Sequence, residues 1–115
     1  MGHIAIEVKD IDRSVKFYRE LFNMDLFRQD EKIALLHTPG YHDRLALLLS
    51  KGEVGHMGLN HFGFFVDEEN YKKALDYVRD NSIKILGGPG VWPTGSKYIY
   101  IEDPDGYKVE ILTEV

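Results

Sequence analysis

The chain has 115 residues, no cysteine and a formal net charge of -5. Its length predicts a single domain, in which folding buries roughly two-thirds of the surface of the unfolded chain. The acidic balance argues against a nucleic-acid partner, because phosphates require a basic surface. The lack of cysteine excludes disulfides and thiolate metal ligands. No apolar run is long enough to span a membrane and no signal-peptide pattern opens the chain, so we expect a cytoplasmic protein with no membrane partner.

The first strand pattern of the chain occurs twice. Residues 3–8 read HIAIEV and residues 61–66 read HFGFFV, so each pattern begins with a histidine. An acidic turn and an amphipathic helix follow each pattern, with Asp12 and Asp67 as the expected N-caps. The apolar positions that mark the helices are Ile11, Val15, Tyr18 and Phe22 in the first and Tyr71, Leu75 and Val78 in the second.

Three further strand patterns follow each helix. They span residues 24–28, 33–38 and 44–50 in the first half and residues 83–86, 97–102 and 107–113 in the second. The chain therefore predicts an α+β fold of two tandem βαβββ modules, residues 1–50 and 59–115, joined by a linker at 51–58 within a single domain, 1–115. Residues 87–90, which read GGPG, are expected to form a mobile cover over the site.

Strand alternation indicates which side chains face away from the helices. Ile4, Ile6 and Val8 form the apolar face of the first strand, so His3 points to the other side. By the same alternation Glu110 lies opposite its apolar neighbours in the last strand. If the sheet curls, this face is the inside of a cup. The polar face collects the histidines His3 and His61, the carboxylate Glu110 and the aromatic pocket walls Tyr98, Tyr100 and Trp92.

Two imidazoles and one carboxylate suit a divalent metal ion with open coordination positions. The 2-His-1-carboxylate set is the ligand pattern of non-haem Fe(II) oxygenases. A carboxylate that faces inward without a cation would also be costly to desolvate. The sequence therefore predicts a metal site formed by His3, His61 and Glu110.

The most specific segment is residues 98–110, YIYIEDPDGYKVE, in which DPDG forms a turn before the strand that carries Glu110. Together with His3, His61 and residues 10–18, DIDRSVKFY, it resembles the vicinal oxygen chelate superfamily. The resemblance implies the glyoxalase/bleomycin-resistance/dioxygenase fold, a cupped, partly closed mixed sheet with helices outside. It also implies a divalent metal on the three ligands and, as in other short members, a homodimer with shared active sites.

The resemblance also separates subgroups of this superfamily. Glyoxalase I and methylmalonyl-CoA epimerase use a fourth protein ligand, Glu or Gln, on the strand that corresponds to residues 44–50. In this chain Leu47 is the expected match to that ligand, and we expect it to line the substrate pocket. Fosfomycin enzymes keep three ligands but place a threonine where this chain has Ala5. Extradiol dioxygenases resemble the chain more closely, because they place a tyrosine ten residues before the glutamate ligand, as Tyr100 is here, and an acid/base histidine near the position of His42.

The best interpretation is therefore an extradiol-dioxygenase-like oxidoreductase that acts on a catechol-like small molecule. Fe(II) or Mn(II) is favoured, with Zn(II), Ni(II) or Co(II) as alternatives. Tyr100 would orient the substrate oxygen and His42 would move the proton, with His56 as the alternative for that role because it lies near His61. One departure is residues 90–93, GVWP, where the dioxygenases carry a further histidine.

Two other functions remain open. The same metal triad could serve a glyoxalase-type lyase or isomerase, or a thiol transferase, which would turn over without O2 on nickel or zinc. Alternatively, the chain could be a metal-free drug-binding protein, similar to bleomycin-resistance proteins. Those proteins generally lack the triad, which disfavours this alternative.

Overall fold

The computed structural model describes residues 3–53 and 59–114, so His56 and the linker residues 54–58 lie outside the described residues. The chain divides into two compact units, Met1–Gly55 and His56–Val115, and each is described by itself. Both units follow the order βαβββ, which confirms the predicted α+β class and its internal repeat. The elements are β1(His3–Val8), α1(Ile11–Phe22), β2(Asp25–Gln29), β3(Ile33–His37) and β4(Arg44–Leu49), then β5(Phe62–Val66), α2(Glu68–Asp80), β6(Ile85–Val91), β7(Lys97–Glu102) and β8(Lys108–Thr113).

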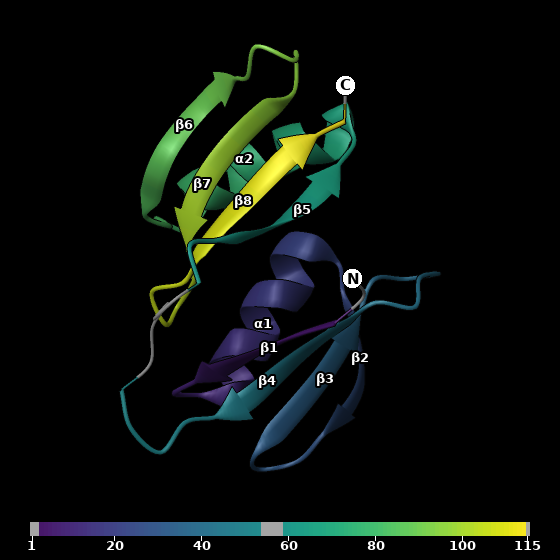
Figure 1. Cartoon of the computed structure of the whole chain (residues 1–115), viewed down its shortest axis with the longest axis vertical. Coiled ribbons are helices and arrows are strands. Elements are labelled where there is room, and N and C mark those ends of the chain that lie inside the picture. The colour runs from purple at the N-terminus through teal and green to yellow at the C-terminus, as the bar shows by residue number, and fades with distance from the viewer. Residues whose placement is uncertain (1–2, 54–58, 115) are drawn as a thin grey trace. The chain divides into compact units, whose positions relative to one another are not determined.

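The sheet of the first unit has the strand order β1-β4-β3-β2, with β1 and β4 parallel and the other pairs antiparallel. α1 packs against β4, as Figure 1 shows. Along β1, Ile6 and Val8 are buried whereas His3, Ala5 and Glu7 are exposed. This alternation confirms that the apolar face of β1 forms core and that His3 faces away from it.

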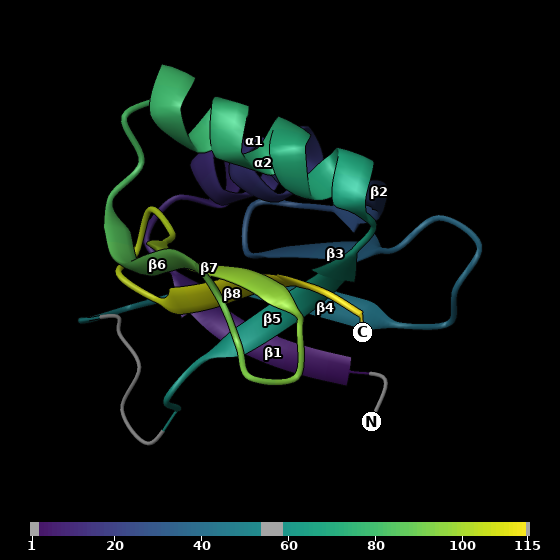
Figure 2. The ribbon, with the colours of Figure 1, turned by 90° about the horizontal axis from the view of Figure 1, so that it is seen from above.

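The second unit repeats this topology. Its strand order is β5-β8-β7-β6, with β5 and β8 parallel, and α2 packs against β8. Figure 2 shows α2 lying over one face of its sheet. Ile99 and Ile101 of β7 and Val109 and Ile111 of β8 are fully buried in the core. The intervening side chains are left for the other face, as the period of two requires. None of the helices in the described part of the chain is long and apolar enough to cross a membrane.

The helix caps confirm one prediction and correct another. Asp67 caps α2, where its side chain accepts a hydrogen bond from the Asn70 backbone N–H. The prediction that Asp12 caps α1 is wrong, because Asp10 holds that position and accepts from the Arg13 N–H at 3.0 Å. An N-cap needs an extended backbone, which Asp10 has with φ -143. Asp12 already lies inside the first turn of the helix.

The glycine-rich segment at residues 87–90 is a strand, so the predicted cover over the site is wrong. It belongs to β6, which pairs with β7 through Gly87 opposite Tyr100 and Gly90 opposite Tyr98, with register shifts between these pairs. A Cβ on Gly90 would lie 2.9 Å from the Tyr98 ring and hydroxyl. The glycines therefore allow β6 to run beside two large rings, a use of strand glycine that sequence pattern does not reveal.

Candidate metal and substrate site

Glu110 is a buried carboxylate on the face of the second sheet opposite to α2. Its neighbours Val109 and Ile111 point into the core, and Glu110 itself is only 7% exposed. Gly63 of β5 is its register partner. A Cβ on Gly63 would lie 2.7 Å from the Glu110 carbonyl oxygen, so the position tolerates glycine alone without a shift of backbone. The glycine also leaves no side chain beside the carboxylate on that edge of the sheet.

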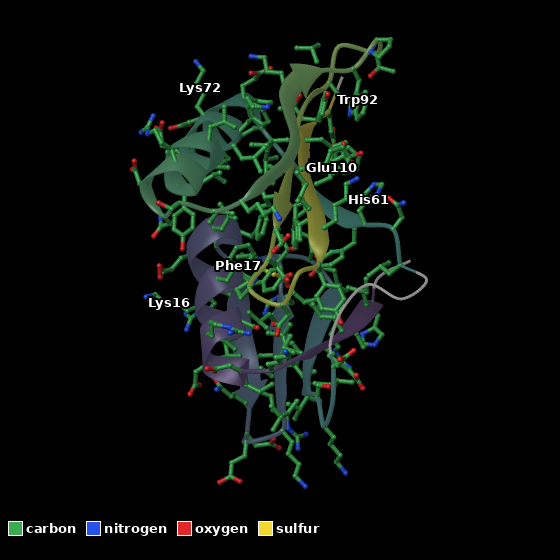
Figure 3. The ribbon with its side chains drawn as sticks, turned by 90° about the vertical axis from the view of Figure 1, so that its left-hand side faces the viewer. Lys16, Phe17, His61, Lys72, Trp92 and Glu110 are labelled. Atoms are coloured by element: carbon green, nitrogen blue, oxygen red, sulfur yellow. The ribbon has the colours of Figure 1, made fainter. Side chains whose placement is uncertain are left out.

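Two side chains from other elements converge on Glu110. Nε2 of His61, just before β5, lies 3.4 Å from Oε1 of Glu110. The indole N–H of Trp92, just after β6, donates to Oε2 at 3.1 Å. Figure 3 shows His61, Glu110 and Trp92 on the side of this sheet away from α2, which carries Lys72. The structure therefore unites two of the three predicted metal ligands and one predicted pocket wall.

The two ring nitrogens of His61 face different groups, Asn60 and Glu110. Nδ1 of His61 lies 2.8 Å from the amide oxygen of Asn60. That oxygen only accepts, so Nδ1 donates the hydrogen bond to it and Nε2 is the ring nitrogen that faces the carboxylate. Two electron-rich atoms that face each other repel unless a proton or a cation lies between them. The donor set of His61 and Glu110 therefore fits a divalent cation, and Asn60 fixes the tautomer that binds one.

Tyr100 lies directly beside this pair. It is the register partner of Glu110 across β7 and β8, and its ring meets the His61 ring edge-on with centroids 5.2 Å apart. Burial raises the pKa of the Tyr100 phenol, and the charge of Glu110 and a side-chain hydrogen bond with it raise the pKa further. The phenol therefore keeps its proton at neutral pH, so Tyr100 can donate a hydrogen bond but does not act as a base.

Trp92 and Tyr98 continue the same face as an aromatic wall. Their rings stack with centroids 3.9 Å apart and an interplanar angle of 15°. The backbone carbonyl of Tyr98 accepts a hydrogen bond from the Tyr71 hydroxyl of α2 at 2.6 Å, which ties the wall to the helix. Lys108 completes the face, with Nζ 4.4 Å from the centroid of the Tyr100 ring. Such a surface suits a flat or partly apolar ligand.

His3 and His42 lie in the first unit, where they share a pocket of about 530 Å³. The residues that line it are His3, Phe27, His37, Tyr41, His42, Asp43 and Arg44. The structure thus places the predicted acid/base histidine beside one predicted metal ligand. No three His, Asp or Glu side chains form a metal site among residues 3–53 and 59–114. The triad combines His3 with residues of the other unit, so its assembly stays a prediction.

Leu47 does not hold the position expected for it. Its side chain is 0% exposed, and its register partner in β1 is Ile6, on the core face of the sheet. Ala46, which pairs with Ala5, occupies the place that Glu110 occupies opposite Gly63. Strand alternation puts Leu47 on the wrong face for a pocket, so that prediction is corrected. The conclusion that this strand supplies no fourth ligand is unchanged, because alanine cannot coordinate a metal.

Two residues near the predicted ligands escaped the sequence interpretation. Asn60 is adjacent to His61, and its amide could have been recognised in the sequence as a hydrogen-bond partner for a candidate ligand histidine. Arg44 is the register partner of His3, a relation that only the pairing of β1 with β4 reveals.

Comparison with known proteins places the chain in a broad superfamily. Residues 1–111 match the family model for the Glyoxalase/Bleomycin resistance protein/Dioxygenase superfamily. The chain is 32% identical to Metallothiol transferase FosB of Staphylococcus epidermidis, over 98% of this chain and 80% of that protein. It is 33% identical to a probable chloroplastic lactoylglutathione lyase of Arabidopsis thaliana, over 97% of this chain and 35% of that protein.

Solved structures agree on the fold. A glyoxalase/dioxygenase from Nostoc punctiforme superposes with a TM-score of 0.82 and 24% identity, covering 99% of this chain and 90% of that one. At this level of identity the likeness supports the fold alone. It confirms the fold class expected from the sequence.

Proposed function

The chain belongs to the Glyoxalase/Bleomycin resistance protein/Dioxygenase superfamily, and we propose that it is a metal-dependent enzyme that joins a thiol to a small oxygenated electrophile or acts as the related lyase. The observation that carries the proposal is the approach of His61 Nε2 to Glu110 Oε1 at 3.4 Å, with Nδ1 held by Asn60. A relative named as a metallothiol transferase, 32% identical over almost the whole chain, favours thiol transfer over oxidation.

His61 and Glu110, together with His3 of the first unit, would hold the divalent ion. When bound, the ion supplies Lewis-acid polarisation of the substrate oxygens. Zn(II), Ni(II), Co(II), Mn(II) and Fe(II) all suit imidazole and carboxylate ligands, so the donor set leaves the metal open.

The remaining groups of the site bind, orient and transfer protons. Asn60 holds the His61 tautomer, and Trp92 holds one oxygen of Glu110 while its ring, stacked on Tyr98, shields the carboxylate from water. Tyr100 retains its proton in a hydrogen bond with Glu110 and would turn it to an oxygen of the substrate when the substrate binds. His42, in the pocket that contains His3, would receive the thiol proton as the C–S bond forms and a C–O bond of the electrophile breaks, and the alkoxide released would take up a proton to give the alcohol.

Ring cleavage of a catechol-like substrate is the second candidate. Tyr100 supports it, because this tyrosine stands ten residues before Glu110, as in the sequence resemblance to extradiol dioxygenases, and it is also the register partner of Glu110 and contacts His61. The aromatic wall of Trp92 and Tyr98 would also suit a planar ring. This reaction needs Fe(II) or Mn(II) and O2, whereas thiol transfer needs neither a redox metal nor oxygen.

Metal dependence and metal identity separate these candidates. The isolated protein is analysed for bound metal, stripped with chelator, and reloaded with Zn(II), Ni(II), Mn(II) or Fe(II). Anaerobic consumption of a thiol with an epoxide, or turnover of a methylglyoxal hemithioacetal, supports the proposal. A ring-opened product from catechols under air with Fe(II) alone would replace it with ring cleavage. A protein that carries no metal and is unaffected by chelator would favour the drug-binding alternative.

We further propose a homodimer in which His3 of one chain meets His61 and Glu110 of the other. Mixing chains that carry His3→Ala with chains that carry Glu110→Gln tests the sharing. In a shared site, refolded mixtures regain metal binding in a fraction of their sites. A monomeric mass in solution with metal still bound would contradict the proposal.

A further inference from the structure

A polar row crosses the end of the first sheet on the face away from α1. The register pairs His3 of β1 with Arg44 of β4, and His37 of β3 with Asp25 of β2. Because Leu36 and Leu45 are partners, Arg44 and His37 are the next pair of positions along β3 and β4. The row therefore sets a guanidinium between two imidazoles, in the pocket of about 530 Å³ that also contains His42.

Arg44 is held over an aromatic ring and has its donors available. Its Cζ lies 5.5 Å from the centroid of the Phe27 ring, a cation–π arrangement that orients the guanidinium plane. In the described part of the chain no carboxylate lies within ion-pair distance of it. The two nearby acidic groups have other partners, since Asp43 accepts from the Thr38 N–H and hydroxyl at 2.7 and 2.6 Å, and Asp25 faces His37 at 3.9 Å.

From this geometry we infer that Arg44 binds an oxyanion of the substrate, a carboxylate or a phosphonate, in the pocket that contains His3 and His42. The planar guanidinium fork matches such a group with two parallel hydrogen bonds. Phe27 and the largely exposed Tyr41, 70% accessible, supply apolar surface for the rest of the molecule. The inference rests on the proposed function, because it assigns the pocket to the substrate of the site that includes His3.

A comparison with the second unit explains why we assign the oxyanion to Arg44 and not to Lys108. Lys108 is its counterpart there, a cation next to a histidine and over a ring, Tyr100. Lys108 stands two residues from the buried Glu110 on the same face of its strand, so an anion near it meets that negative charge. The chain as a whole also carries a net charge of -5. The pocket of Arg44 also contains one carboxylate, Asp43, but its two oxygens accept hydrogen bonds from Thr38.

Phenylphosphonate is the probe, titrated into the full chain with Zn(II) and again after chelator treatment, with amide chemical shifts as the readout. We expect shifts to centre on residues of the Arg44 pocket. Arg44→Gln should weaken the binding at least about tenfold, because a charge-assisted pair is lost. Arg44→Lys should retain part of it. Arg79→Gln on α2, where the arginine pairs with Asp76, is the matched control and should bind normally.

Equal binding by Arg44→Gln and the parent would overturn the inference, as would equal shifts with the neutral probe benzyl alcohol. Metal content is measured in parallel on the same samples. Phenylphosphonate binding that depends on Arg44 in a protein that takes up no metal would support the oxyanion site and reject the proposed function. If metal uptake is normal and phenylphosphonate binding does not depend on Arg44, only the oxyanion site is rejected.

Discussion

The two units share one architecture but carry their charge in different places. In the second unit Glu110 sits in the middle of the sheet opposite Gly63, buried and in contact with an imidazole and an indole. The equivalent pair in the first unit is Ala5 and Ala46, which have no polar side chain. There the polar groups gather at the strand ends, around Arg44. The two copies thus share a cation at this strand end, Arg44 or Lys108, and differ in the buried carboxylate of the second copy.

This difference indicates that the two copies of the fold bury different groups at equivalent positions. Burial of a carboxylate is costly unless it has charged or hydrogen-bonding partners, so one copy packs such partners around a single carboxylate. The other copy keeps small residues there and leaves an open pocket at its edge. Substitutions at equivalent positions of the two units can therefore test this difference.

The largest effect is expected from His61→Ala in the second unit. The loss of an imidazole ligand beside Glu110 should lower metal affinity by more than about a hundredfold, beyond what loss of an outer partner costs. His37→Ala removes an imidazole of the first unit that is not a predicted ligand, and this control should bind metal normally. Metal-competition titration measures both variants. If His61→Ala protein takes up metal as well as the parent, the assignment of this face as the metal site is wrong.

Gly63→Ala should destabilise the protein by about 1–3 kcal/mol, because its Cβ would overlap the Glu110 carbonyl and force β5 from β8. Urea unfolding measures the loss. Ala5→Gly, at the equivalent place in the first unit, creates no clash and should cost about 0.5–1 kcal/mol through chain entropy. If both substitutions lowered the free energy of unfolding by the same amount, the difference between the two units would not be one of packing.

Trp92→Phe keeps an aromatic ring against Tyr98 but removes the N–H that donates to Glu110. The loss of one hydrogen bond to a carboxylate should lower metal affinity about tenfold without unfolding the unit. Trp92 is the only tryptophan in the chain, so its fluorescence in the parent should also change on metal binding. An unchanged affinity in the variant, or unchanged parental fluorescence, would remove Trp92 from the site.

The smallest effect concerns alkaline stability. Since the pKa of Tyr100 is raised in the folded state, the folded protein holds this proton more tightly than the unfolded chain. The stabilisation is complete below the unfolded pKa of about 10 and is lost as pH rises through the folded pKa. Tyr100→Phe should therefore show a shallower fall of stability above pH 10 in urea unfolding. A slope identical to that of the parent would mean that burial at Tyr100 has no such effect.

Much of this site could be predicted from local pattern. The alternation of Ile4, Ile6 and Val8 shows which way His3 points, and the DPDG turn sets the start of the strand that carries Glu110. Both signals lie within a few residues of the group that they orient. The assignment of Leu47 failed because it required the register between β1 and β4, where a shift of one residue moves a side chain to the other face.

Hydrophobic period and turn chemistry act over short stretches of chain, so the repeated βαβββ order and the faces on which His61 and Glu110 lie could be predicted from local pattern. The folded chain was needed to establish that the glycine-rich segment pairs as β6, that Trp92 reaches Glu110, and that Arg44 stands beside His3. Those relations join residues far apart in the chain, and they depend on strand register and on the space that a missing Cβ leaves.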